Sequence, residues 1–163
     1  DNMTIRDGVS LYGGCMYAWG TMGTLTMTSS TVTNCEGTSS SYGGGGLFIR
    51  SVGGVSITSS SFTSNTTAGS GGAIHIFDEN FSIDKSTFSN NTSSGSGGAI
   101  YLDGDNNLPT STITNSTFDG NSADVSPGND FGGAMYFYYG KVSLVNSTIF
   151  NNNSQIGVLS HTR

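Results

Sequence analysis

The chain has 163 residues, a length that suits a single domain over residues 1–163. Five Lys and Arg stand against eleven Asp and Glu, and this net charge of -6 argues against a nucleic-acid partner, which would need a basic surface. No apolar run approaches the roughly 18 residues of a membrane-spanning helix, so we expect no direct membrane span.

A glycine pair followed by a short apolar segment recurs along the chain. In chain order the copies are GGCMYAW at 13–19, GGGLFIR at 44–50, GGAIHIF at 71–77, GGAIYLD at 97–103 and GGAMYFY at 132–138. A second string follows each copy: LTMTSSTVTNC at 25–35, VSITSSSFTSN at 55–65, FSIDKSTFSNN at 81–91, STITNSTFDGN at 111–121 and VSLVNSTIFNN at 142–152. Recurrence at about two dozen residues or more predicts a solenoid.

Within each unit the apolar residues alternate with a period of two, which indicates strands. Ile74 and Ile76, then Phe81 and Ile83, and then Phe88 should point inward from three successive strands, and the other units repeat this pattern. We therefore expect an all-β, single-stranded parallel β-helix of about five to six coils, with three short strands per coil. Parallel crossover connections favour a right-handed coil.

Two polar columns fit this solenoid. Ser30, Ser60, Ser86, Ser116 and Ser147 occupy one bend, where a hydroxyl can bind backbone groups. Asn65, Asn91, Asn121 and Asn152 occupy another and are expected to form an asparagine ladder. Cys35 takes the asparagine position in the remaining unit. Cys15 and Cys35 either form a disulfide in an oxidising compartment, or Cys35 is a buried small apolar side chain.

The pairing of GGAI with FTSN at 62–65, FSNN at 88–91 and FDGN at 118–121 resembles the repeats of the polymorphic outer membrane protein family. More broadly, it resembles the pectin-lyase-like right-handed β-helices. The likeness covers essentially the whole chain. It implies a right-handed β-helix in an extracellular or cell-surface setting, with adhesion as a role.

An outward aromatic column is the main candidate binding surface. It contains Tyr17, Trp19, Phe48, His75, Phe77, Tyr101, Tyr136 and Tyr138. Exposed aromatic patches commonly mark interfaces, although these side chains could also be filler. Asp78, Asp103 and Asp105 form a weak candidate for Ca²⁺, against the alternative of a solvated turn. Because no set of catalytic groups converges, we expect no enzyme activity and no cofactor.

Asparagine sequons are frequent, and Asn115, Asn146, Asn80 and Asn2 are the candidates for glycosylation in a eukaryotic secretory route. A Ser and Thr array on the third strand raises ice binding as a less favoured function. Asp119 and Phe150 interrupt that array.

The leading hypothesis is a non-catalytic extracellular structural β-helix in a cell-surface or filamentous assembly, with a role in adhesion. The chain begins and ends within a coil, which predicts either a fragment of a longer solenoid or a subunit that stacks end to end. Partners would be further copies of the chain, other surface proteins or glycans. The alternative is a carbohydrate-binding or polysaccharide-degrading β-helix.

Overall fold

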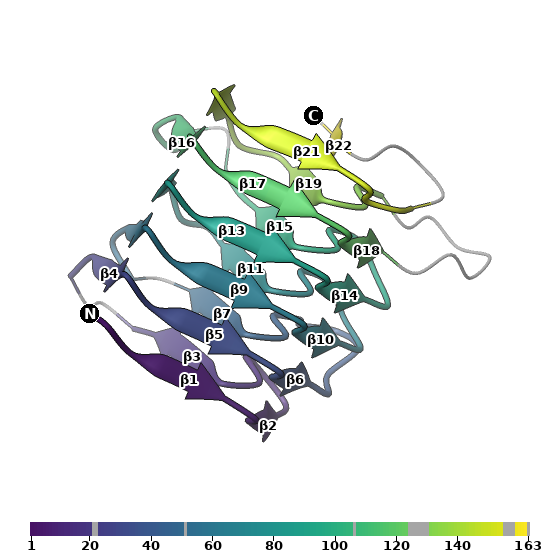
Figure 1. The fold of residues 1–163 in the computed structure, drawn as a ribbon. Coiled ribbons are helices and arrows are strands. Elements are labelled where there is room, and N and C mark those ends of the chain that lie inside the picture. The colour runs from purple at the N-terminus through teal and green to yellow at the C-terminus, as the bar shows by residue number, and fades with distance from the viewer. Residues whose placement is uncertain (21–22, 51, 106, 124–130, 155–158, 163) are drawn as a thin grey trace.

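The computed structural model describes residues 1–20, 23–50, 52–105, 107–123, 131–154 and 159–162. Its strands form four parallel sheets around one core, and the chain passes through the sheets in turn (Figure 1). Each coil stacks on the one before it, so the N-terminal and C-terminal coils lie at opposite ends of the stack. The described residues include no helix that is long and apolar enough to cross a membrane.

Each sheet collects one strand from each coil, and we name it by its first strand. The β3 sheet contains β3 (Met16–Trp19), β7 (Leu47–Arg50), β11 (Ile74–Phe77), β15 (Ile100–Asp103), β19 (Met135–Tyr138) and β22 (Leu159–Thr162). The β4 sheet contains β4 (Leu25–Thr28), β8 (Val55–Thr58), β12 (Phe81–Asp84), β16 (Ser111–Thr114) and β20 (Val142–Val145). The β1 sheet contains β1 (Thr4–Arg6), β5 (Thr31–Thr33), β9 (Ser61–Thr63), β13 (Thr87–Ser89), β17 (Thr117–Asp119) and β21 (Thr148–Phe150). The β2 sheet contains β2 (Val9–Ser10), β6 (Glu36–Gly37), β10 (Thr66–Thr67), β14 (Thr92–Ser93) and β18 (Ser122–Ala123).

The predicted all-β parallel solenoid is confirmed, but the expectation of three strands per coil omits the β2 sheet. Its strands are two residues long and carry no apolar alternation, as in Glu36–Gly37 and Thr66–Thr67. They pair in parallel, with Thr66 beside Glu36 on one side and Thr92 on the other. The alternation of apolar side chains therefore cannot predict strands in this part of the coil.

The core is built from identical positions stacked in register. Ile74 pairs with Leu47 on one side and Ile100 on the other, and all three side chains are buried. The rings of Phe62, Phe88 and Phe118 stack with centroids 4.9 and 4.8 Å apart and planes nearly parallel. This spacing matches the separation of about 4.8 Å between neighbouring strands, so these three coils each contribute one ring to the stack, and Val32 and Ile149 continue the same column in the adjacent coils.

Serine hydroxyls hold the corner between the β4 and β1 sheets. The backbone N–H of Ser60 donates to Ser86 Oγ at 3.1 Å, and Ser86 Oγ donates to the Asp84 carbonyl two residues earlier at 2.9 Å. The residue before each serine has positive φ, as Ser59 and Lys85 do at 51° and 48°. The hydroxyl therefore forms hydrogen bonds with backbone groups at a bend, where the regular hydrogen bonds between strands are interrupted.

Each of the two positions in a glycine pair requires glycine for a steric reason. Gly71 has φ +75°, a backbone conformation that side chains rarely adopt. Gly72 lies so close to the next coil that a Cβ would collide with the Gly98 carbonyl oxygen. The pair allows the chain to turn and lets the coils stack closely before each strand of the β3 sheet.

Candidate binding surface

The outer face of the β3 sheet carries a column of rings at one register position. Tyr17, Phe48, His75, Tyr101 and Tyr136 follow one another on successive strands. Their neighbouring ring centroids lie 5.4, 4.9, 4.7 and 5.5 Å apart in that order. The structure therefore brings these predicted residues together.

The interpretation of this column as a surface is wrong for three of its members. Phe48, His75 and Tyr136 are only 2%, 4% and 6% exposed. The segments that precede the glycine pairs fold over them. Tyr42 contacts the Phe48 ring edge-on at 5.9 Å, and Phe131 stacks on Tyr136 at 5.3 Å.

Burial also determines the chemistry of His75. Its Nδ1 accepts a hydrogen bond from the Gly43 backbone N–H at 3.1 Å. Desolvation lowers the pKa of His75 to about 3, and the Ser70 backbone carbonyl opposes this shift only in part. The ring is therefore neutral near neutral pH and acts as a fixed acceptor that holds the covering segment.

The second outward column contains Trp19, Arg50, Phe77, Asp103 and Tyr138. Trp19 is 63% exposed and Tyr138 is 37% exposed. The Arg50 guanidinium lies over the half-buried Phe77 ring, 4.5 Å from its centroid, in a cation–π contact. Exposed aromatic surface thus lies mainly at the N-terminal end of the β3 sheet, with Tyr138 several coils away.

A shallow pocket of about 120 Å³ opens at that N-terminal end. Tyr12, Tyr17, Tyr42, Phe48 and Arg50 line it. The sequence prediction omitted Tyr12 and Tyr42 because they lie outside the strands of the repeat. Each stands directly before a run of glycines, as Phe131 also does, and this shared position is the signal that could have identified them.

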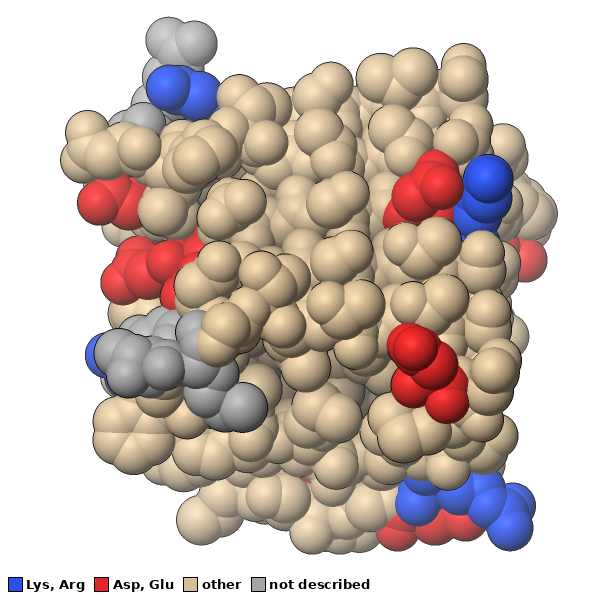
Figure 2. Space-filling model, turned by 90° about the vertical axis from the view of Figure 1, so that its left-hand side faces the viewer, with Lys and Arg blue, Asp and Glu red and all other residues tan. Residues whose placement is uncertain are grey.

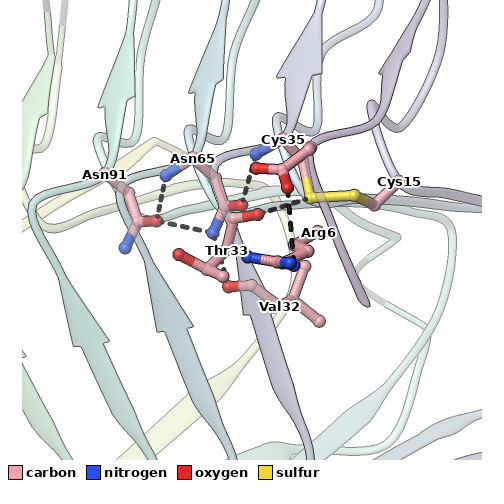
Figure 3. The surroundings of a disulfide bond; sticks show 8 residues. Arg6, Cys15, Val32, Thr33, Cys35, Asn65 and Asn91 are labelled. Carbon is pink, nitrogen blue, oxygen red and sulfur yellow. Dashed lines mark hydrogen bonds and ion pairs between the residues drawn. A yellow bond between two sulfur atoms is a disulfide. The ribbon is translucent and has the colours of Figure 1, made fainter. Parts of the chain in front are cut away.

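Cys15 and Cys35 form a disulfide next to the asparagine ladder (Figure 3). Within the ladder, Asn65 Nδ2 donates to Asn91 Oδ1 at 3.0 Å, and Asn91 Nδ2 donates to Asn121 Oδ1 at 2.9 Å. Asn121 in turn donates to Asn152 at 2.8 Å. The Cys35 backbone N–H joins the same series by donating to Asn65 Oδ1 at 3.1 Å.

Coils that stack in register through four parallel sheets place this chain in a known structural class. A protein-family model described as a right handed beta helix region matches residues 2–163. The chain belongs to the right-handed β-helix family. No curated protein and no solved structure matches the chain.

In this right-handed β-helix, the predicted acidic group is only partly assembled. Asp78 and Asp105 line one open pocket with Gly104 and Tyr139. Burial, and then the nearby Asp78 carboxylate, raise the pKa of Asp103. Among the described residues no group of three or more His, Cys, Asp or Glu side chains is arranged to hold a metal ion.

The candidate glycosylation sites differ in their surroundings. Asn2, Asn115 and Asn146 are exposed, whereas Asn80 is half-buried. Asn115 Nδ2 donates to Asp84 Oδ1 at 2.7 Å, and this bond is the main reason why the pKa of Asp84 is lowered. The amide of Asn115 is therefore already engaged.

The β4 sheet presents a hydroxyl-rich face on the outside of the β-helix. One outward register column on this sheet contains Thr26, Ser56, Ser82, Thr112 and Ser143. Figure 2 views this side, and its charged side chains lie toward the margins of the face. On the neighbouring β1 sheet, Asp119 and Phe150 interrupt the corresponding hydroxyl column.

Proposed function

We propose that this right-handed β-helix is a non-catalytic structural component of an extracellular surface or filamentous assembly. The Cys15–Cys35 disulfide carries the proposal. Disulfides persist in extracellular and other oxidising compartments and are rare in the cytosol. The serine and asparagine ladders support a structural role, because their hydrogen bonds tie each coil to the next. Such a scaffold would present its outer faces to other surface proteins, to glycans or to further copies of itself.

The states of two titratable groups on the β3 sheet, His75 and Tyr101, also support a non-catalytic role. A general acid or base needs a pKa near the working pH and access to a substrate. His75 is buried, is neutral near pH 7 and is hydrogen-bonded to Gly43. Burial raises the pKa of the Tyr101 hydroxyl in the same column, which moves it away from the working range.

The test is thiol labelling of the protein as it occurs in its own source. Cell-surface, secreted and cytosolic fractions are alkylated with iodoacetamide without reductant, and duplicate samples are alkylated after reduction. Because Cys15 and Cys35 are the only two cysteines of these 163 residues, the mass gain of the peptides that contain them shows directly whether the disulfide is present. We expect the protein in the secreted or surface fraction, with neither Cys15 nor Cys35 labelled before reduction and both labelled after it. Protein found in the cytosol with both thiols free would contradict the proposal.

A second candidate function is carbohydrate binding, with adhesion as its consequence, and the aromatic pocket at the N-terminal end of the β3 sheet favours it. Polysaccharide degradation is the catalytic form of this alternative. Turnover of an acidic polysaccharide that is lost in Asp103→Asn or Asp105→Asn would favour degradation over binding.

A further inference from the structure

We infer that the pocket lined by Tyr12, Tyr17, Tyr42, Phe48 and Arg50 binds one sugar ring of a neutral glycan, and that Trp19 stacks on the next ring. The inference rests on the second candidate function and assigns it a place and a ligand class.

Tyr17 and Trp19 are two exposed aromatic side chains at the pocket. They are alternate residues of β3, so their side chains leave the same face of the sheet. Their rings lie 6.2 Å apart with planes only 19° from parallel, and they are 46% and 63% exposed. A pyranose ring has a face of C–H groups and a rim of hydroxyls. The exposed aromatic surface of each of these two side chains therefore offers a stacking contact to the C–H face of a sugar.

The walls of the pocket are held before any ligand arrives. Tyr12 contacts Tyr17, Tyr42 and Phe48 with centroid distances of 5.7, 6.0 and 6.1 Å. Tyr12 also precedes Cys15 by three residues, and the disulfide ties that segment to the core. A preformed site loses little conformational freedom on binding, which favours affinity.

Arg50 supplies the polar recognition. Its guanidinium has five N–H donors and no acceptor, and Phe77 covers one of its faces. The two ion pairs among the described residues are Arg6–Asp7 and Lys85–Asp84, so no described carboxylate neutralises Arg50. Its charge disfavours a cationic ligand, and its donors suit the hydroxyl oxygens of a sugar. The net charge of -6 disfavours a strongly acidic glycan.

The test uses the fluorescence of Trp19, the only tryptophan of the chain. Cellotriose, maltotriose and N-acetylchitotriose are titrated into the protein, with trigalacturonate as the acidic comparison. We expect a saturable change with at least one neutral probe. Tyr17→Ala should weaken that binding about tenfold, which corresponds to the loss of about 1.4 kcal/mol from a central aromatic contact. Arg50→Gln should weaken it too while leaving the aromatic walls in place.

Tyr138→Ala is the matched control, because Tyr138 is exposed at the same register column as Trp19 but lies outside the pocket. It should bind like the parent protein, and melting temperatures establish that each variant is folded. Loss of binding in Tyr138→Ala with binding retained in Tyr17→Ala would overturn the pocket but not carbohydrate binding. Tighter binding of trigalacturonate than of the neutral probes would overturn the ligand class. No saturable change with any neutral probe would overturn the inference. If trigalacturonate also failed to bind, the second candidate function would fall with it, and the disulfide-linked structural role would stand as it is.

Discussion

Replacement of Asn91 by alanine tests whether the asparagine ladder stabilises the stack of coils. Asn91 is fully buried. Its Oδ1 accepts from the backbone N–H and from Nδ2 of Asn65, both at 3.0 Å. Its Nδ2 donates to the Phe62 carbonyl at 3.0 Å and to Asn121 Oδ1 at 2.9 Å. Asn91→Ala removes all four of these hydrogen bonds.

The expected cost follows from the number of bonds. At about 1 kcal/mol net for each, the free energy of unfolding should fall by about 4 kcal/mol. The Asn65 N–H and the Phe62 carbonyl are backbone groups that would each lose this buried partner. Such groups cost more when left unpaired than the bond itself contributes. The loss should therefore exceed that of an ordinary surface substitution several-fold.

Equilibrium denaturation in urea, followed by far-UV circular dichroism, measures this loss. Thr92→Ala is the control, because Thr92 is the next residue along the chain and its side chain is exposed. The control should change stability by no more than about 0.5 kcal/mol. If Asn91→Ala cost less than about 1 kcal/mol, the hydrogen-bond arithmetic above would be refuted.

Three further changes test other parts of the structure. Reduction of the Cys15–Cys35 disulfide, whose cysteines are 20 residues apart, should cost about 3 kcal/mol by loop-closure entropy, and an unchanged melting temperature in reductant would contradict this. Because the folded pKa of His75 is about 3 and its unfolded value is near 6.5, its contribution to stability is complete above pH 6.5 and is lost as the pH falls toward 3. His75→Phe should lose this dependence. Urea denaturation at several pH values should show that the free energy of unfolding falls less steeply with decreasing pH in the variant than in the parent protein; an equal dependence on pH in the two proteins would exclude His75 as the cause. Gly72→Ala should lower the melting temperature strongly, because its Cβ would collide with a backbone carbonyl of the next coil, whereas Gly23→Ala meets nothing within 4 Å and should not; equal melting would rule out the steric explanation.

The repeat made the fold predictable because each coil must place the same residue types at the same points. Apolar residues at a period of two predicted the strands, and a recurring Asn predicted a buried column. The β2 sheet could not be predicted in this way. Its strands, such as Thr92–Ser93, follow the ladder asparagine directly and pair through backbone groups, which leave no apolar pattern in the sequence.

The candidate site was less predictable because it depends on residues outside the repeat. Register alone placed Phe48 and Tyr136 on the outer face of the β3 sheet, and this placement is right. Their exposure depends on the segments before the glycine pairs, where Tyr42 and Phe131 pack over them. These segments vary in length and sequence between units, so the strand pattern carries no information about where they fold.

The disulfide lies where one unit of the repeat departs from the asparagine column. In the next coil, Asn65 Oδ1 accepts a hydrogen bond from the Cys35 backbone N–H, and Asn65 Nδ2 donates one to the Val32 carbonyl. Cys35 has no amide to donate in the same way. A Cβ on Gly46, the register counterpart of Cys15, would lie 3.5 Å from Asn65 Cγ, so these two positions face each other across one coil. At this pair of positions the first unit therefore has a covalent bond, whereas the later units have a glycine or alanine facing a hydrogen-bonded asparagine.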